Sequence, residues 1–372
     1  MAEPFKNQLG RSRIKLIAQH LKRVYPSFSS EAFLKSSLCN LDDLSLMERS
    51  RQITVALQQH LPDSFSEACE VVEAALAPED NQIDELGIHG WLAIPFCDFV
   101  GHESHHDIEQ ALKMLSVLTP YFSSEWGIRH ILSDRFHLAE LTLKQWITHE
   151  NEHVRRLVSE GSRPRLPWGI QLKNVIDNPE LTFPLLDALK DDSSEYVRKS
   201  VANHLNDYSK DHADWLIKKI KPWWMDKKAT PQRKKVIRHG LRTLIKAGHE
   251  PTLSLLGYTA LSPNRVNLSL SENKVIYGKT FEIQVEIDMP SKEDAILDYA
   301  IHFQKANGEL SPKVFKWKSC QLKQGSQVFK KKHTIKPITT RRYYNGLHKI
   351  EVLLNGESVA IDEFNLSGVT ES

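Results

Sequence analysis

The spacing of apolar residues along the chain changes once, near residue 260. Before that point apolar side chains recur every three or four positions, as in residues 68–76 and 108–118, which is the period of an amphipathic α-helix. After about residue 264 apolar and polar side chains alternate, which is the period of a β-strand. The pattern predicts a multidomain α plus β protein, with an all-α domain over residues 1–260 and an all-β domain over residues 264–372.

A sequence motif recurs within the predicted helical domain. Residues 152–160 (EHVRRLVSE) align with residues 195–203 (EYVRKSVAN) at an offset of 43, and residues 237–238 follow residues 197–198 by a further 40. This period is typical of HEAT-type repeats, in which pairs of helices stack into a solenoid. An earlier Ile-Arg pair at residues 128–129 breaks the spacing. We therefore expect an irregular HEAT-like solenoid, with a non-repetitive helical bundle as the alternative.

The repeat also sorts side chains by helix face. Positions four apart lie on one face of a helix, so two stripes about half a turn apart are expected on the helix that begins near residue 195. The apolar stripe comprises Val197, Val201 and Leu205, and the polar stripe comprises Lys199, Asn203 and Asp207. Stacked repeats align such polar stripes along one surface, which in many solenoids binds a ligand.

The last third of the chain predicts seven short strands in about 105 residues. Asn-Gly pairs at residues 307–308, 345–346 and 355–356 supply tight turns between them. This strand number and spacing are typical of an immunoglobulin-like sandwich. The predicted strands span residues 266–270, 281–287, 296–303, 314–317, 328–335, 349–354 and 359–366.

The net charge of +2, from 49 basic and 47 acidic residues, conceals an uneven distribution. Residues 1–150 carry a net charge of −8 and residues 151–209 carry −1, whereas residues 210–263 carry +8 and residues 264–372 carry +3. Residues 305–349 hold twelve basic side chains and a single acid. Such segments are typical either of solvated surfaces or of a surface that binds a polyanion.

Several functional classes are not supported. No run of eighteen apolar residues predicts a membrane span, and residues 1–7 lack the layout of a secretory signal, so a cytoplasmic location is expected. No phosphate-binding Gly-rich loop or nucleophile elbow is present. Residues 102–106 (HESHH) match the zinc-protease signature. They lie just before a predicted helix start at Asp107, so we interpret the match as coincidence and expect no metal.

A denser group of polar and aromatic residues spans residues 123–207. Glu125 and Arg129 are four residues apart, so the guanidinium is expected to hold the carboxylate. A loop over residues 161–167 contains two prolines and two arginines, with Glu160 before it and Trp168 after it. Each residue alone has a structural explanation as a surface ion pair or as core filling. Two carboxylates, several arginines and a tryptophan on one polar surface favour a functional site.

At these residues the sequence resembles the AlkC branch of the AlkC/AlkD family of DNA glycosylases, which are built from HEAT-like repeats. The resemblance covers most of the chain, from the opening residues 2–6 (AEPFK) through the Ser-Ser-Glu, Val-Arg-Arg and Val-Ala-Asn motifs to residues 341–348 (RRYYNGLH). One AlkC subgroup carries a C-terminal immunoglobulin-like domain. Trp126-Gly127 replaces the Phe-Ala often found in the family, and Lys199 stands where many relatives have Arg.

The resemblance implies hydrolysis of the N-glycosidic bond of cationic N3-alkylated bases, chiefly 3-methyladenine and 3-methylcytosine, in double-stranded DNA. It also implies that the base is not flipped into a pocket. The family's catalytic positions fall on Glu125, Glu160, Trp168 and Asp207. We further expect DNA contacts from Arg129, Arg156, Arg163, Arg165, Lys199, Asn203, Arg238, Arg242, Lys331, Arg341 and Arg342.

The expected chemistry needs no cofactor. A base that already carries a positive charge can leave without a general acid, while the developing oxocarbenium sugar needs anionic stabilisation and a placed water. We expect a monomer in the cytoplasm that associates with the bacterial nucleoid when engaged on DNA. Two alternatives from other classes are a non-catalytic HEAT-repeat protein that binds damaged or branched DNA, and a protein-interaction scaffold.

Overall fold

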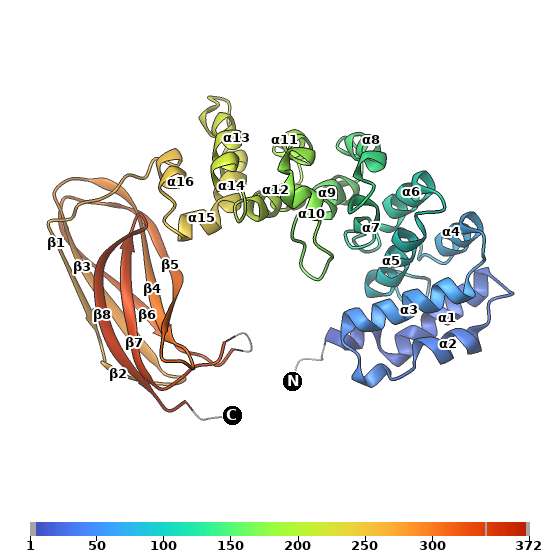
Figure 1. Cartoon of the computed structure of the whole chain (residues 1–372), viewed down its shortest axis with the longest axis horizontal. Helices are drawn as coiled ribbons and strands as arrows, with labels where there is room; N and C mark the ends of the chain where they lie inside the picture. Colours follow the sequence, from blue (N-terminus) through green and yellow to red (C-terminus); the bar gives the residue numbers. More distant parts are fainter. Residues whose placement is uncertain (1–4, 339–340, 370–372) are drawn as a thin grey trace. The chain divides into compact units, whose positions relative to one another are not determined.

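The computed structural model describes residues 5–338 and 341–369 (Figure 1). The Ala2 to Pro4 part of the opening motif lies outside these residues. Helices fill the chain up to residue 255 and strands follow from residue 265, which confirms the predicted fold class. No helix within the described ranges is long and apolar enough to cross a membrane.

The helical part begins with a short 3₁₀ helix and contains sixteen α-helices within the described residues. The α-helices are α1 (Arg11–Val24), α2 (Ser30–Ser37), α3 (Leu46–His60), α4 (Phe65–Ala74), α5 (Ile94–Glu103), α6 (Ile108–Leu118), α7 (Arg129–Leu132), α8 (Phe136–Trp146), α9 (Glu152–Gly161), α10 (Lys173–Asp177), α11 (Phe183–Leu189), α12 (Glu195–Tyr208), α13 (Ala213–Met225), α14 (Pro231–Gly240), α15 (Arg242–Lys246) and α16 (Glu250–Leu255). The 3₁₀ helices are η1 (Phe5–Leu9), η2 (Leu41–Asp43), η3 (Gly90–Ala93) and η4 (Pro179–Leu181).

The chain divides into two compact units. The first comprises residues 1–211 and 230–240, and the second comprises residues 212–229 and 241–372. Helices α13, α15 and α16 therefore group with the strands. The domain boundary near residue 260 stays a prediction from the change in sequence period.

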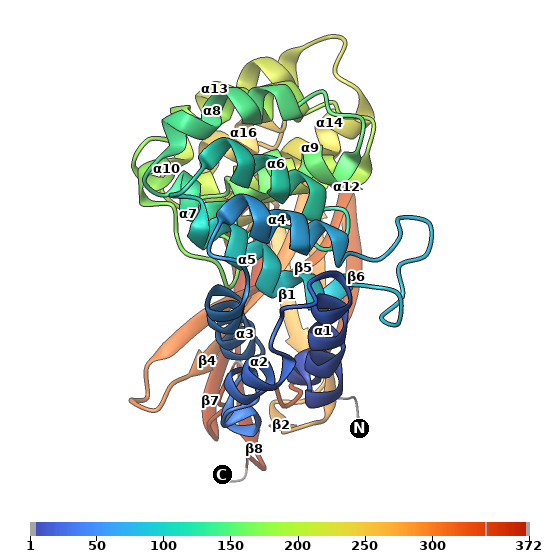
Figure 2. The same cartoon turned by 90° about the vertical axis from the view of Figure 1, so that its right-hand side faces the viewer.

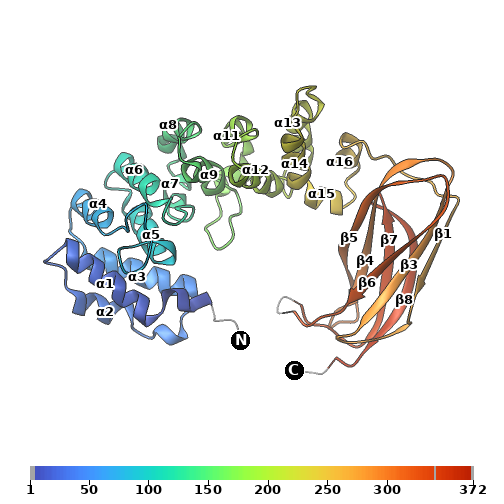
Figure 3. The same cartoon turned by 180° about the vertical axis from the view of Figure 1, so that it is seen from behind.

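The first unit contains two layers of helices from α4 onward. Helices α4, α6, α8 and α11 form one layer, and α5, α7, α9, α12 and α14 form the other, as both faces of the molecule show (Figures 1 and 3). The long connection between α4 and η3 extends away from these helices (Figure 2). Helix α12 packs between α9 and α14, so the three segments that share the sequence repeat are neighbours in space, as in a HEAT-like solenoid.

The two repeat helices α9 and α12 begin and bury their faces in similar ways. The side chain of Asn151 caps the first turn of α9 and that of Ser194 caps α12, each by accepting a hydrogen bond from a backbone N–H two residues on. The predicted apolar stripe of α12 is fully buried. The predicted polar stripe is only partly exposed: Lys199 faces solvent, whereas Asp207 is 1% exposed.

The second unit contains a sandwich of two sheets. One sheet has the strand order β1-β3-β6 and the other has the order β2-β8-β7-β4-β5. All neighbouring strands are antiparallel except β2, which runs parallel to β8. The strands are β1 (Arg265–Leu270), β2 (Lys274–Ile276), β3 (Thr280–Met289), β4 (Glu293–Gln304), β5 (Leu310–Leu322), β6 (Gly325–Thr334), β7 (Gly346–Leu354) and β8 (Glu357–Ser367).

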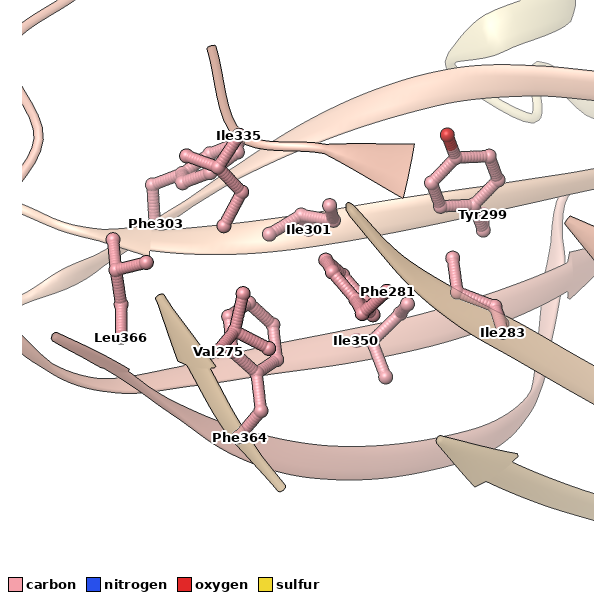
Figure 4. Close-up of a cluster of buried hydrophobic side chains, with 10 residues drawn as sticks. All are labelled: Val275, Phe281, Ile283, Tyr299, Ile301, Phe303, Ile335, Ile350, Phe364 and Leu366. Carbon is pink, nitrogen blue, oxygen red and sulfur yellow. The ribbon is translucent and has the colours of Figure 1, made fainter. Parts of the chain in front are cut away.

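Inward-facing side chains from both sheets form the core of the sandwich. One cluster joins Phe281 and Ile283 of β3 to Tyr299 and Ile301 of β4 and Phe364 of β8 (Figure 4). Alternate residues of β3 and β7 are buried, which is the signature of strands with one face on a core. All seven predicted strands are present, and the prediction missed β2, which has three residues and no room for an alternating pattern.

The segment before α7 packs against α5 with backbone directly on backbone. A Cβ atom added at Gly127 would lie 2.1 Å from the carbonyl oxygen of Cys97, and one added at Gly101 would lie 2.2 Å from the carbonyl oxygen of Gly127. No side chain larger than hydrogen fits at either position. This contact fixes the turn that carries Glu125 and Trp126.

We predict that Gly127→Ala lowers the free energy of unfolding by about 3 kcal/mol, because the added methyl group forces two backbones apart. Gly90→Ala is the control: its Cβ would meet no atom within 4 Å, and only the positive φ of 54° opposes it, at about 1 kcal/mol. Urea unfolding followed by circular dichroism measures both values. Equal losses would contradict the close packing at Gly127.

Candidate functional site

Three carboxylates from three segments of the first unit meet in one ion-pair cluster. Glu125 lies in the turn before α7, Glu160 lies in the last turn of α9, and Asp207 lies in the last turn of α12. Their exposed fractions are 9%, 5% and 1%. Buried carboxylates persist as anions only when cations and hydrogen-bond donors surround them.

Arg156 joins Glu125 to Glu160. Its guanidinium donates to a Glu125 oxygen and to the hydroxyl of Ser123, at 2.6 Å in the second case, and that hydroxyl donates to Glu125 at 2.8 Å. Its other terminal nitrogen lies 3.5 Å from Glu160 Oε1. The predicted pairing of Glu125 with Arg129 is therefore wrong: the guanidinium that holds Glu125 comes from α9, thirty-one residues away.

Arg163 joins Glu160 to Asp207. Its Nη1 donates to Glu160 Oε1 at 2.7 Å, and its Nε donates to Asp207 Oδ2 at 2.8 Å. Lys210 adds a second cation to Asp207, with Nζ 3.1 Å from Oδ1. Arg163 is 8% exposed, so its guanidinium faces carboxylates and not solvent, which corrects the expectation that it grips a phosphate.

The cluster keeps Glu160 ionised. Burial by itself raises the pKa of the carboxyl group, but the charges of Arg156 and Arg163 and the hydrogen bond from Ser200 together outweigh burial and lower the pKa of Glu160 below its ordinary value of 4.5. The C-terminal end of a helix carries partial negative charge, which disfavours a carboxylate there. The two arginines offset this effect at the end of α9.

A chain of hydrogen bonds supports Glu160 from α12. Ser200 donates to Glu160 Oε2 at 2.6 Å, and Ser159 donates to the Ser200 hydroxyl at 2.6 Å. His204 lies fully buried below them, with Nδ1 2.9 Å from the carbonyl oxygen of Ser159. Burial lowers the pKa of His204 to about 3, so this ring is neutral at ordinary pH.

Arg129 is fully buried and binds backbone, which is a correction of its predicted phosphate contact. Its guanidinium donates to the carbonyl oxygens of Gly161, Arg163, Pro164 and Ile170 at 2.8, 2.7, 3.4 and 2.6 Å. Gly161 ends α9, and the other three carbonyls belong to the loop between α9 and α10, which projects from the helices (Figures 1 and 3). Burial and the nearby charge of Arg163 lower the pKa of Arg129 to about 10, so it stays charged.

The same loop carries Trp168 and Arg165. Trp168 is 61% exposed and has a positive φ of 63°, a backbone region that costs a non-glycine residue conformational energy. Its ring stacks on Trp126 with centroids 6.4 Å apart and planes 21° apart. Arg165 forms a two-pronged ion pair with Asp211, at 3.0 and 2.9 Å.

A groove on the first unit gathers basic side chains. It lies between α12 and α14, has a volume of about 550 Å³, and includes Arg198, Lys199, Lys235 and His239 in its lining. Of the predicted DNA-contacting residues, Lys199 lines this groove, and Arg238 is exposed on α14. Asn203 is half-buried on α12.

The remaining predicted contacts lie in the second unit. Arg242 begins α15 and Lys331 lies on β6, both half-buried. The guanidinium of Arg341 sits over the ring of Phe303, 4.3 Å from its centroid, and that of Arg342 sits 5.7 Å from the centroid of Tyr344. Both arginines therefore form cation–π contacts with aromatic rings.

The zinc-protease geometry is not formed in this region. Helix α5 ends at Glu103, so it does not present His102 and His106 on one face. The ring of His102 instead contacts that of His130, with centroids 3.9 Å apart. A different group within the described ranges, comprising Glu103, His105 and His106, brings ligand atoms within 4.8 Å of one another at the surface. The absence of a functional metal stays a prediction.

Sequence reasoning missed Ser200 and Trp126 as parts of the site. The repeat alignment contained a signal for Ser200, because it places this serine at the position of Leu157, which faces the core in the preceding repeat. A hydroxyl at an inward position indicates a buried hydrogen-bond partner. No sequence pattern indicated that Trp126 stacks on a residue forty-two positions away.

Two family models match the chain. A model described as "DNA alkylation repair enzyme" matches residues 119–241, a range that contains all three carboxylates, and a model described as "Uncharacterised protein YhaZ, C-terminal Ig-like domain" matches residues 264–368. The second match agrees with the predicted immunoglobulin-like sandwich.

Individual relatives match over almost the full length. The chain is 35% identical over 347 residues to the protein YhaZ of Bacillus subtilis (strain 168), and the alignment covers 92% of this chain and 94% of YhaZ. Its structure is similar to that of the Pseudomonas fluorescens alkylpurine DNA glycosylase AlkC bound to DNA containing an abasic site analog. The TM-score is 0.90 at 34% identity, over 98% of this chain and 100% of AlkC.

We predict that Ser200→Ala raises the pKa of Glu160 toward its ordinary value, because it removes a hydrogen bond that favours the carboxylate. Since the wild-type pKa is lowered, the carboxylate charge persists to lower pH than in the variant. A titration of ¹³C-labelled glutamate by NMR measures the difference, with the Glu160 signal assigned by its loss in Glu160→Gln. Ser209→Ala, whose hydroxyl donates to a backbone carbonyl instead, is the control. An unchanged Glu160 pKa in Ser200→Ala would refute the assigned role.

Proposed function

Because this chain belongs to the AlkC group of DNA alkylation repair enzymes that carry a C-terminal immunoglobulin-like domain, we propose that it is a DNA glycosylase that excises N3-alkylated bases from duplex DNA. The substrates are cationic bases such as 3-methyladenine and 3-methylcytosine. The reaction is hydrolysis of the N-glycosidic bond. The observation that carries the proposal is the cluster in which the carboxylates of Glu125, Glu160 and Asp207 each pair with an arginine.

The carboxylates match the charge that develops in this reaction. An N3-alkylated base is already positively charged and leaves as a neutral molecule, so no general acid is required. The sugar left behind acquires oxocarbenium character, which a fixed anion stabilises. Glu160 suits this role because its pKa is lowered and it is preorganised by Arg163 and Ser200. The same anion can also orient the attacking water.

Trp168 supplies an aromatic face for the sugar. Its ring is exposed on the loop that Arg129 holds, and the face of an indole attracts a cationic group by about 0.5 to 2 kcal/mol. We propose that Trp168 contacts the deoxyribose while the DNA is bent. The base then stays outside a pocket, unlike in glycosylases that flip their substrate.

DNA is held through basic side chains on both units. We propose phosphate contacts from Lys199, Arg238 and Arg165 on the first unit and from Arg242, Lys331, Arg341 and Arg342 on the second. We also propose DNA contacts from Arg156, which pairs with Glu125 and Glu160, and from Asn203 on α12. Because one duplex provides an asymmetric partner, a monomer is the proposed active state, located in the cytoplasm.

We predict that Glu160→Gln abolishes release of 3-methyladenine and leaves affinity for the duplex largely intact, because it removes the anion and preserves the shape of the side chain. Release of free base from a methylated duplex is measured by chromatography, and affinity by fluorescence anisotropy. Glu140→Gln is the control and should retain activity, because Glu140 is a half-buried residue of α8 whose carboxylate pairs with Lys144.

Two outcomes of that experiment would redirect the proposal. Normal release by Glu160→Gln would sink the assignment of Glu160. No release by the wild-type protein across a panel of alkylated bases, together with salt-sensitive DNA binding, would favour the non-catalytic DNA-binding alternative. Affinity that does not depend on salt would favour a protein-interaction scaffold.

We predict that replacing both Arg341 and Arg342 with alanine weakens binding to alkylated and unmodified duplex to the same degree. Each lost phosphate contact also reduces the slope of log affinity against log salt by about 1. The control pair Lys274→Ala and Lys292→Ala removes the same charge from exposed positions outside residues 305–349. A slope equal to that of the wild-type protein would assign the two arginines to solubility.

A further inference from the structure

Trp126 contacts the proposed sugar-binding residue in two independent ways. Its ring stacks in near-parallel fashion on that of Trp168, with centroids 6.4 Å apart. Its indole N–H donates a hydrogen bond to the backbone carbonyl of Pro167, the residue before Trp168, at 3.2 Å. One contact thus fixes the ring, and the other fixes the backbone from which the ring projects.

The side chain of Trp168 needs such support because of its position in the chain. The residue lies between Pro167 and Gly169 in a loop, outside any helix or strand, with a positive φ and an exposed ring. A side chain in this setting has several accessible rotamers, and the left-handed backbone is maintained only if neighbouring contacts hold it. A Cβ added at Gly169 would lie 3.2 Å from Trp126 Cδ1, so the loop closes tightly over the Trp126 ring.

The ring of Trp126 is itself held in place by aromatic neighbours on the side away from Trp168. Its other stacking partner is Phe122, with centroids 5.9 Å apart and planes 21° apart, and Phe122 contacts Trp91 at 5.0 Å. The adjacent Gly127 is locked against α5 by backbone contact. Two residues after Gly127, Arg129 binds the carbonyl at the end of α9 and three carbonyls of the loop. The segment 122–129 is therefore a rigid base against which the loop is clamped.

We propose that Trp126 is a positioning residue that fixes the indole of Trp168 in the orientation in which it meets the deoxyribose of a damaged nucleotide. The inference rests on the proposed glycosylase function. Trp126 does not touch the reacting atoms. Trp126 restricts the motion of the Trp168 indole before DNA binds. The entropy cost of ordering that ring is therefore not part of the reaction barrier.

The kinetic consequence is specific. Loss of Trp126 leaves phosphate contacts and carboxylates in place, so affinity for the duplex is unchanged, whereas the rate of base release at saturating enzyme falls. A misplaced reacting partner costs roughly ten- to a hundredfold in rate. Because Trp126 acts through Trp168, its removal has no further effect once Trp168 is absent.

A double-mutant cycle tests this coupling. Single-turnover release of 3-methyladenine is measured for the wild type, Trp126→Ala, Trp168→Ala and the double variant, alongside affinity by anisotropy. We expect each single variant to be slower at unchanged affinity, and the double variant to be no slower than Trp168→Ala. Rate losses that multiply in the double variant, or an effect of Trp126→Ala on affinity alone, would overturn the proposal.

The conservative variant Trp126→Phe tests the stacking contact and the hydrogen bond separately. It also provides a test that does not depend on whether Trp126→Ala folds. Phenylalanine retains a ring for stacking on Trp168 and lacks the N–H that binds Pro167. We expect this variant to fold with the wild-type unfolding midpoint and to release base at a rate between those of the wild type and Trp126→Ala. A rate equal to that of Trp168→Ala would also support positioning, through the hydrogen bond. A wild-type rate in both Trp126 variants would refute it.

A spectroscopic measurement keeps this inference separable from the proposed function. Two stacked indoles couple excitonically, which gives a paired positive and negative band in the circular dichroism spectrum. We expect the couplet in the wild type and its loss in both Trp126→Ala and Trp168→Ala, with Trp146→Phe on α8 as the control that keeps it. Survival of the couplet in Trp126→Ala overturns the positioning role. A normal couplet without base release by the wild type instead contradicts the glycosylase function.

Discussion

The guanidinium of Arg163, buried between Glu160 and Asp207, is the interaction on which the rest of the site depends. It compensates two carboxylates from two different helices at 2.7 and 2.8 Å, and so ties the end of α9 to the end of α12. Breaking a buried pair of this kind costs about 3–5 kcal/mol, because it leaves a charge without a partner in a medium of low polarity. Arg163 also lies two residues after the end of α9, near the start of the loop that carries Trp168. One side chain therefore both balances the charge of the cluster and anchors the first part of that loop.

The buried guanidinium of Arg129 supports the same loop through a different kind of contact. Arg163 binds carboxylates, whereas Arg129 binds backbone carbonyls and lies three residues after Trp126 in sequence. The family to which the chain belongs supplies the frame of helices and the appended sandwich. Within this frame, segment 122–129 is the rigid support for the loop between α9 and α10. The carboxylate of Glu160 is held in place by Arg163 and Ser200. The proposed reaction therefore requires the DNA to bend and requires no rearrangement of these side chains.

Features set by local periodicity could be predicted from the sequence, and features set by distant neighbours could not. The burial of Val197, Val201 and Leu205 follows from helical spacing alone, and the alternating strands β3 and β7 follow from a period of two. Strand β2 was missed because three residues carry no period. The pairing of Glu125 with Arg156 and the burial of Arg129 depend on residues thirty or more positions away. Both residues had plausible local partners or ligands, so local reasoning assigned them wrongly.

The way in which Arg129 holds its loop has an evolutionary consequence. All four of its acceptors are main-chain oxygens, and every amino acid offers the same oxygen whatever its side chain. The clamp is therefore indifferent to the identity of the residues it grips. An exposed side chain such as that of Ile170 can therefore change in evolution, or be recruited for new contacts, while the path of the chain stays constant. In a loop held through its backbone, selection can change the side chains that contact a ligand while the loop keeps its conformation.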